Sequence, residues 1–220
     1  MPPALLVQSL VCAGNMIGCA PYYQVESDHH HVNLYVALVG ESAKARKGTS
    51  RRRVHAIMKI ADERWHDDHV KTGLSSGEGL INEVRDPVQK WDPDAKMWKT
   101  CDPGIADKRL MIVEDEFAGA LSVMERHGNT LSPILRKAWD GGRLATLTKN
   151  APISSTRAHI SIIAHILRRV LGTSLLRSPG VLENAPGVAA RYHCRCFGCA
   201  ANPATLFQIR GRGQGNPSLS

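Results

Sequence analysis

The sequence predicts an α/β domain with a mainly parallel sheet, and three short apolar runs are the main reason. They lie at residues 33–39, 110–113 and 159–166. Each run is almost continuous in apolar residues, as is typical of a strand that is buried on both faces of a parallel sheet. Segments with helical periodicity lie between the runs, which is the pattern expected when crossover helices join parallel strands.

The chain opens with a segment that predicts a helix at residues 4–18, followed by a short strand at residues 22–26. Residues 27–31, Ser-Asp-His-His-His, predict the turn that leads into the first buried strand. Three consecutive histidines raise the question of a metal site. Because neighbouring residues of a turn or strand point in different directions, the sequence favours a solvated turn instead.

Composition limits the partners and the compartment. The 220 residues are enough for one full core, and they carry a net charge of +8 with an isoelectric point near 9.4. This charge favours an anionic partner, either DNA or a nucleotide. The sequence has no apolar run long enough to span a membrane, so we expect no membrane contact. The scattered Cys12, Cys19 and Cys101 favour the reducing cytoplasm.

The first apolar run leads into a pattern typical of a phosphate-binding loop. After the run come a glycine, a loop of small and basic residues, and a segment that continues as a helix. In such a loop, backbone N–H groups face the phosphates, a lysine reaches the outer phosphates and a hydroxyl binds Mg²⁺. Here Lys47 would contact the β- and γ-phosphates, and Thr49 or Ser50 would bind the metal. The residues predicted to bind the nucleotide are Gly40, Arg46, Lys47, Gly48, Thr49 and Ser50.

The match to the usual loop sequence, G-x-x-x-x-G-K-[ST], is imperfect. Counted from Gly40, the lysine position holds Arg46, and Lys47 arrives one residue late. A basic surface turn therefore remains an alternative to a nucleotide site.

Three acids follow the second apolar run without a break: Glu114, Asp115 and Glu116. Acids at the end of a buried strand repel one another and lose solvation unless a cation compensates them. In a nucleotide-hydrolysing site that cation is Mg²⁺, and another acid orients the attacking water. Strand alternation places Glu114 and Glu116 on one face, so we predict that Glu114 binds the metal and Glu116 orients the water. A solvated strand end is the alternative.

The remaining segments predict loops and further helices. Residues 73–81 contain glycines and serines that would let a ligand approach the backbone, or a helix that Ser76 caps. Residues 86–104 contain three prolines and predict an irregular insertion or a loose hairpin. Helices are predicted at residues 117–127 and at 130–139, the second capped by Thr130, and a strand is predicted at residues 144–148.

His165 lies near the end of the third apolar run. In nucleotide motors, the strand beside the carboxylate strand often ends in a polar residue that senses the γ-phosphate, and His165 stands where such a residue would. We therefore include His165 among the predicted catalytic residues. A core histidine whose nitrogens are hydrogen-bonded is the alternative.

Taken in order, these motifs resemble those of a known family, the RecA-like P-loop ATPases of phages, plasmids and integrated elements. Members often lie beside primase modules and are described as helicase-like. The resemblance covers about residues 4–169. The segments that carry it are Asn33–Gly40, Ala45–Ser50, Gly73–Leu80, Val113–Phe117, Gly128–Ser132, Ala138–Gly141, Thr146–Asn150 and His159–Ile163.

The resemblance implies a three-layer RecA-like P-loop NTPase domain over residues 1–170, with ATP and Mg²⁺ as cofactors. It implies ATP binding and hydrolysis by a helicase or helicase loader in the DNA replication of a mobile element. DNA, further copies of the chain and a primase are the partners that it implies. Family members commonly have a glycine in place of Ala45 and a different sequence in place of Ala164–Leu167.

Residues 171–220 do not resemble the family. They are rich in Gly, Pro, Arg and Ser and lack periodicity, so they predict a basic tail of low order. A truncated or frame-shifted gene would produce such a tail and would leave the sheet incomplete at its C-terminus. The tail contains His193, Cys194, Cys196 and Cys199, which are too closely spaced to favour a zinc site.

Two other functions remain open from the sequence. One is a catalytically impaired remnant that only binds nucleotide or DNA, which the tail favours. The other is a small-molecule nucleotide kinase, because Lys47-Gly48-Thr49 also occurs in such enzymes. A kinase would need an arginine-rich lid, and residues 86–104 do not supply one.

Overall fold

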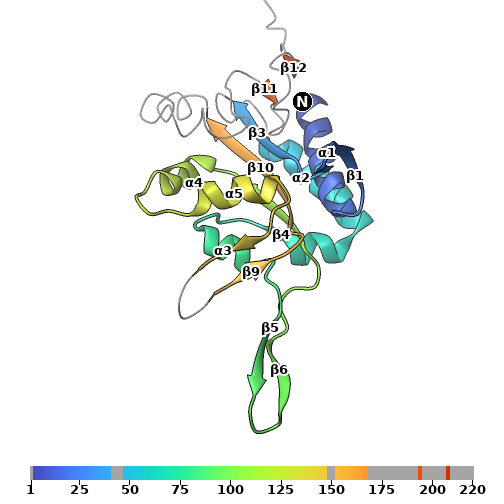
Figure 1. Cartoon of the computed structure of the whole chain (residues 1–220). Helices are drawn as coiled ribbons and strands as arrows, with labels where there is room; N and C mark the ends of the chain where they lie inside the picture. The colour runs from blue at the N-terminus through green and yellow to red at the C-terminus, as the bar shows by residue number, and fades with distance from the viewer. Residues whose placement is uncertain (1, 41–46, 148–151, 168–192, 195–206, 209–220) are drawn as a thin grey trace, which may run out of the picture.

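The structure, a computed structural model, describes residues 2–40, 47–147, 152–167, 193–194 and 207–208 (Figure 1). Its helices are α1 (Pro2–Ile17), α2 (Lys47–Ala61), the π-helical segment η2 (Trp65–His69), α3 (Gly77–Asn82), α4 (Phe117–Met124) and α5 (Leu131–Trp139). Its strands are β1 (Tyr22–Val25), β2 (Asp28–His31), β3 (Tyr35–Gly40), β4 (Val70–Lys71), β5 (Val88–Asp92), β6 (Met97–Asp102), β7 (Arg109–Glu114), β8 (Leu144–Ala145), β9 (Ser154–Ser155), β10 (His159–Leu167), β11 (His193–Cys194) and β12 (Phe207–Gln208).

Four strands form one parallel sheet in the order β3-β10-β7-β4. β10 pairs with β3 on one side and with β7 on the other, so Ala164 lies between Ala37 and Glu114. The three apolar runs of the sequence are β3, β7 and β10. The predicted α/β class with a parallel sheet is confirmed.

Helices cover both faces of this sheet. α1, α2 and η2 pack on the face that carries Val36, Met111 and Ile163. α3 and α5 pack on the opposite face, which carries Leu110 and Ile160. The strand order accounts for this division. The chain crosses the sheet in one direction from β3 to β4 and returns through β7 to β10, and right-handed crossovers then place their helices on opposite faces.

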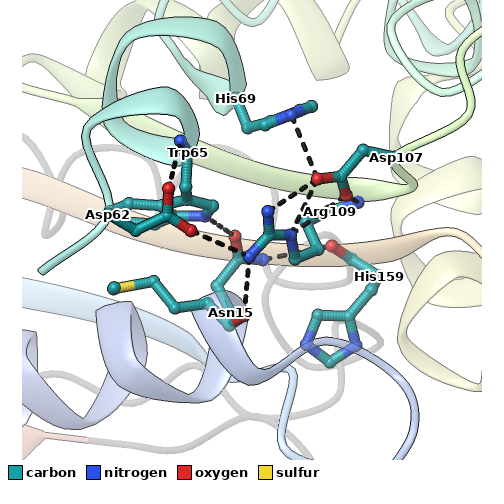
Figure 2. Close-up of polar contacts among 8 residues, drawn as sticks. Asn15, Asp62, Trp65, His69, Asp107, Arg109 and His159 are labelled. Carbon is teal, nitrogen blue, oxygen red and sulfur yellow. Dashed lines mark hydrogen bonds and ion pairs between the residues drawn. The ribbon is translucent and has the colours of Figure 1, made fainter.

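A single buried side chain ties α1 to the sheet. Asn15 is fully buried, and its amide nitrogen donates to the carbonyl oxygens of Leu110 and His159 at 3.1 Å and to the Ser161 hydroxyl at 3.2 Å. Its amide oxygen accepts a hydrogen bond of 2.8 Å from the indole nitrogen of Trp65. Asn15 therefore connects α1, η2, β7 and β10 at the beginning of the two central strands (Figure 2).

An ion-pair cluster surrounds this connection. Arg109, the first residue of β7, contacts Asp107 at 2.6 Å and Asp62 at 3.3 Å, and it donates to the Met16 carbonyl oxygen at 2.8 Å (Figure 2). His69 approaches Asp107 at 3.2 Å. Burial alone would raise the pKa of Asp107, but the hydrogen bonds from Arg109 outweigh it and hold the pKa below its usual value. The N-terminal edge of the sheet is thus held by charged groups that compensate one another.

The prediction of a turn at residues 27–31 is wrong. Residues 28–31 form β2, which pairs antiparallel with β1 through the two-residue turn Glu26-Ser27. Glu26 adopts a φ of 53°, which allows the tight reversal. The His29 ring stacks on Tyr22 with ring centroids 4.0 Å apart. The histidines therefore alternate along a strand and do not converge on one point.

The predicted helices at residues 4–18, 117–127 and 130–139 correspond to α1, α4 and α5. The cap predicted for α5 differs. Thr130 stands at the N-cap, but its hydroxyl donates to both carboxylate oxygens of Glu78 at 3.0 Å. The neighbouring Asn129 instead accepts a hydrogen bond of 2.8 Å from the Leu131 backbone. Of the strand predicted at residues 144–148, residues 144–145 form β8, which pairs with β9, residues 146–147 are not in a strand, and residue 148 lies outside the described residues.

Residues 86–104 form a hairpin, one of the two forms that the sequence predicts. β5 and β6 pair antiparallel and project away from the body of the protein (Figure 1). Trp91 and Trp98 face each other across the strands with ring centroids 5.7 Å apart, and each is more than half exposed. Arg85 and Asp102 form an ion pair of 2.6 Å at the base of the hairpin.

Within residues 171–220, the structure describes only β11 and β12, which pair antiparallel. The division at residue 170 and the predicted low order of the tail remain predictions, and Cys196 and Cys199 lie outside the described residues. In the described part of the chain, none of the helices has the length and apolar character that crossing a bilayer requires.

Candidate functional site

The candidate site lies at the C-terminal edge of the parallel sheet. The connection that leaves β3 runs to α2 on one face, whereas the connection that leaves β7 runs to α4 on the side of α5. In open α/β sheets, ligands bind at the carboxyl ends of strands, where the connections diverge to opposite faces. In this chain that place is above β10, between β3 and β7.

The elements that flank the predicted phosphate-binding loop meet this edge. β3 ends at Gly40 and α2 begins at Lys47, so the strand and the helix flank the loop as the sequence predicts. Residues 41–46, including Arg46, lie outside the described residues. Gly48 is exposed and Thr49 is half-buried at the start of the helix.

Ser50 belongs to the core of the domain. It is 1% exposed, and its hydroxyl accepts a hydrogen bond of 2.9 Å from Gln8 of α1. Of the two hydroxyls that the sequence offers for Mg²⁺, Thr49 is the more accessible. The contact between Ser50 and Gln8 instead ties the first turns of α2 to α1.

Glu114, the last residue of β7, is buried and organises the neighbouring loop. Its Oε1 atom accepts hydrogen bonds from the backbone N–H of Gly73 at 2.7 Å and of Leu74 at 2.6 Å. Hydrogen bonds to an ionised acceptor are stronger than neutral ones, so this carboxylate fixes the chain where β4 leads into α3. Because both bonds reach the same oxygen, Oε2 is the remaining candidate for a metal ligand.

Asp115 lies in a cluster that the sequence did not predict. Its carboxylate pairs with Arg51 of α2 at 2.8 Å and approaches the Nδ1 atom of His165 at 3.3 Å. His165 is 2% exposed at the end of β10, beside β7. Asp115 thus joins α2, β7 and β10 at the C-terminal edge of the sheet.

Strand alternation does not extend to Asp115 and Glu116. β7 ends at Glu114, and the next two residues form a turn before α4. The prediction that Glu114 and Glu116 share one face rested on continued alternation, and in this respect it is wrong. Glu116 is exposed at the N-cap of α4, with φ −131° and ψ 73°, and its side chain does not cap the helix.

The glycine- and serine-rich segment at residues 73–81 contains a helix cap and one close packing contact. Ser76 caps α3 by accepting a hydrogen bond from the Gly79 backbone at 3.0 Å, as the sequence predicts. A Cβ atom on Gly77 would lie 2.7 Å from the hydroxyl oxygen of Thr130. This glycine therefore allows α3 to approach α5. A cavity of about 300 Å³ does open beside the segment, lined by residues 71–76 and by Gly79, Leu80, Glu83 and Ile112.

The described residues contain no group of three or more His, Cys, Asp or Glu side chains arranged to hold a metal ion. Mg²⁺ bound with a nucleotide does not need such a group, because it keeps several waters and takes one or two protein oxygens beside the phosphates. Thr49, Glu114 and Asp115 supply oxygens of this kind at the same edge of the sheet. The donor set therefore fits Mg²⁺ bound together with a phosphate chain.

Comparison of the chain with known proteins finds no match, neither with a protein-family model nor with a curated protein.

Proposed function

We propose that the chain is a RecA-like P-loop ATPase that binds ATP and Mg²⁺ at the C-terminal edge of its sheet. The position of β10 carries this proposal. β10 lies between the strand that leads into the predicted loop and the strand that ends in the acids, and it carries His165 to within 3.3 Å of Asp115. A polar residue in this place agrees with the resemblance to nucleotide motors.

The proposed roles of the residues follow from their positions. Lys47, at the start of α2, contacts the β- and γ-phosphates, and the N-terminus of α2 faces the same anion. Thr49 and Glu114 would hold Mg²⁺, which would supply positive charge beside the phosphate oxygens. These roles were predicted from the sequence, and the flanking strand and helix support them.

Two acids are candidates for orienting the attacking water. The sequence favours Glu116, which is exposed at the beginning of α4. The structure adds Asp115, which is held by Arg51 and lies next to His165. In the reaction, a water oxygen attacks the γ-phosphorus, the bond to the β–γ bridging oxygen breaks, and ADP and phosphate leave.

We further propose that ATP hydrolysis serves DNA work in the replication of a mobile element, as a helicase or a helicase loader. The resemblance and the net charge of +8 support DNA as a partner. Further copies of the chain and a primase are the proposed protein partners. A form that binds nucleotide without turnover is the outcome that would favour the remnant alternative.

Titration of the purified chain with ATP, with and without Mg²⁺, tests the proposal. We expect Lys47→Ala to weaken ATP binding at least about tenfold, because a charge-assisted contact to phosphate contributes more than ~1.4 kcal/mol. Unchanged affinity would remove Lys47 from the site.

Binding and hydrolysis measurements on variants of the same chain show which of the two acids orients the water. We expect both Glu116→Gln and Asp115→Asn to retain ATP binding. The variant that replaces the water-orienting acid should lose hydrolysis. The other variant serves as the matched control. Loss of binding and hydrolysis together, in a protein that remains folded, would contradict the role for that acid.

A further inference from the structure

A second cavity lies against the body of α2, on the side of the sheet that α1 and η2 cover. It has a volume of about 330 Å³. Val70 and Val113 form its apolar wall, and Thr72 also lines it. The charged and imidazole side chains that line it are Arg51, Arg52, His55, His66, Lys71 and Asp115, and we name it the Arg52 pocket.

Positive charge exceeds negative charge in the Arg52 pocket. Three lining residues are permanent cations, and Asp115 is the one acid among the described lining residues. Arg51 already compensates Asp115 at a distance of 2.8 Å. Within the described part of the chain, Arg52 and Lys71 form no ion pair. Two cations therefore remain for an anionic ligand.

The two histidines of the pocket include a buried ring nitrogen that needs a hydrogen-bond partner. His55 and His66 lie with ring centroids 5.5 Å apart at an angle of 76°. The Nε2 atom of His55 is buried, and no hydrogen-bond partner for it is found among the described residues. Buried polar atoms are nearly always hydrogen-bonded, so this nitrogen is available for a hydrogen bond to a group that enters the pocket.

His55 is a neutral hydrogen-bonding group at physiological pH. Burial, together with His66 and Arg51, lowers the pKa of His55 to about 4. Its ring can therefore donate one hydrogen bond from a nitrogen, in the tautomer that the ligand requires. Arg52 and Lys71 supply positive charge, and His55 supplies a directional hydrogen bond.

We propose that the Arg52 pocket binds the phosphate group of a small phosphate ester. Arg52 and Lys71 pair with its oxygens and His55 donates a hydrogen bond. The volume lies at the lower end of the range of small-molecule sites, and the two valines give the pocket an apolar wall, as is usual for such sites. Of the described residues, none from 47 to 50 lines the pocket, and Asp115 borders both the pocket and the proposed ATP site. The pocket therefore adjoins that site and goes beyond it by binding a second phosphate group.

NMR of the imidazole signals during titration with inorganic phosphate tests this inference on the full chain. The signals of His55 and His66 are assigned with His55→Gln and His66→Gln. We expect both signals to shift and to saturate. Arg52→Ala should weaken the apparent affinity about tenfold, because it removes a charge-assisted contact. Arg52 is exposed on a helix and alanine favours helices, so this variant should fold.

Arg53→Ala is the matched control. Arg53 is the next residue of the same helix and is also exposed, but it does not line the pocket. We expect it to change the phosphate affinity less than about twofold, because solvent screens an exposed charge outside the pocket. Equal weakening by Arg52→Ala and Arg53→Ala would show general attraction by a basic helix and would overturn the proposal.

Two further measurements show where the phosphate binds and whether the pocket accepts a nucleic-acid backbone instead. In Lys47→Ala the shifts of His55 should persist, whereas their loss would place the phosphate in the nucleotide loop and overturn the proposal. A short oligodeoxythymidylate should not displace inorganic phosphate from the pocket. Displacement would show that the pocket reads a nucleic-acid backbone and would overturn the proposal. An absence of shifts at ~10 mM phosphate, a concentration that detects even weak binding, would show that no site exists.

Discussion

Replacing Glu114 separates its two proposed roles, the attachment of a loop and the binding of Mg²⁺. Its Oε1 atom accepts two backbone hydrogen bonds, from Gly73 and Leu74, at 2.7 and 2.6 Å. Glu114→Ala leaves both N–H groups without this acceptor. Glu114→Gln retains a side-chain oxygen in the same place and removes only the charge.

The contacts of Glu114 give the size of the expected loss in the free energy of unfolding. A hydrogen bond to a charged group contributes roughly 1.5–3 kcal/mol, so two contribute about 3–6 kcal/mol. Removing a buried carboxylate also removes its cost of desolvation, which offsets part of this loss. We therefore expect Glu114→Ala to lower the free energy of unfolding by about 2–4 kcal/mol, and Glu114→Gln by about 1 kcal/mol.

Urea denaturation measures both values, because domains are usually stable by about 5–15 kcal/mol and the losses are a large fraction of this. In the folded Glu114→Gln protein, ATP titrations with and without Mg²⁺ then report the metal role. We expect the enhancement of ATP binding by Mg²⁺ to fall at least about tenfold. Equal destabilisation by both variants would refute the attachment through Oε1, and unchanged Mg²⁺ dependence would remove Glu114 from the metal site.

Three further predictions concern stability. Asn15→Ala should lower the free energy of unfolding by about 2–3 kcal/mol, because it leaves the Trp65 indole nitrogen buried without a partner. In a double-mutant cycle with Trp65→Phe the two losses should be clearly non-additive, and simple addition would contradict a direct bond. The low pKa of His55, about 4 against a usual 6.5, means that the unfolded chain takes up a proton between these pH values while the folded chain does not. Stability should therefore fall as pH decreases from 6.5 to 4. His55→Gln should reduce this fall by about 1–2 kcal/mol in urea denaturation series, because solvent partly screens a half-buried ring; an unchanged fall would contradict it. Gly77→Ala should destabilise by about 1–3 kcal/mol because its Cβ would collide with α5, whereas Gly119→Ala, with open space around it, should be neutral or stabilising by up to about 1 kcal/mol. Thermal melting of the two alanine variants measures the difference, and equal melting temperatures would contradict the close approach.

The positions of the central strands could be predicted because a strand that is buried on both faces needs apolar residues at nearly every position. β3, β7 and β10 are nearly continuous apolar runs, and short runs of this kind are rare outside buried strands and buried helix segments. The helices were predicted from periodicity, because each buries one face. The strand order was not predicted, because apolar runs carry no information about which strand lies next to which.

The cluster of Arg51, Asp115 and His165 depends on that strand order and was not predicted either. These residues are far apart in the sequence and meet because β10 lies beside β7, with α2 packed on the same edge. The orientation of Asp115 was also not predictable from alternation. The alternation rule applies while a strand continues, and β7 ends one residue earlier.

The β5–β6 hairpin has a practical consequence. Its strands mainly contact each other, and Arg85 and Asp102 close its base, so its tip is separated from the core by several residue pairs. Exposed tips of this kind tolerate inserted sequence. An affinity peptide or a fluorophore-labelling sequence placed between Asp94 and Lys96 would immobilise or report on the protein from the end opposite to the strand C-termini (Figure 1). Surface-attachment and single-molecule measurements would then leave the edge above β10 open to solution.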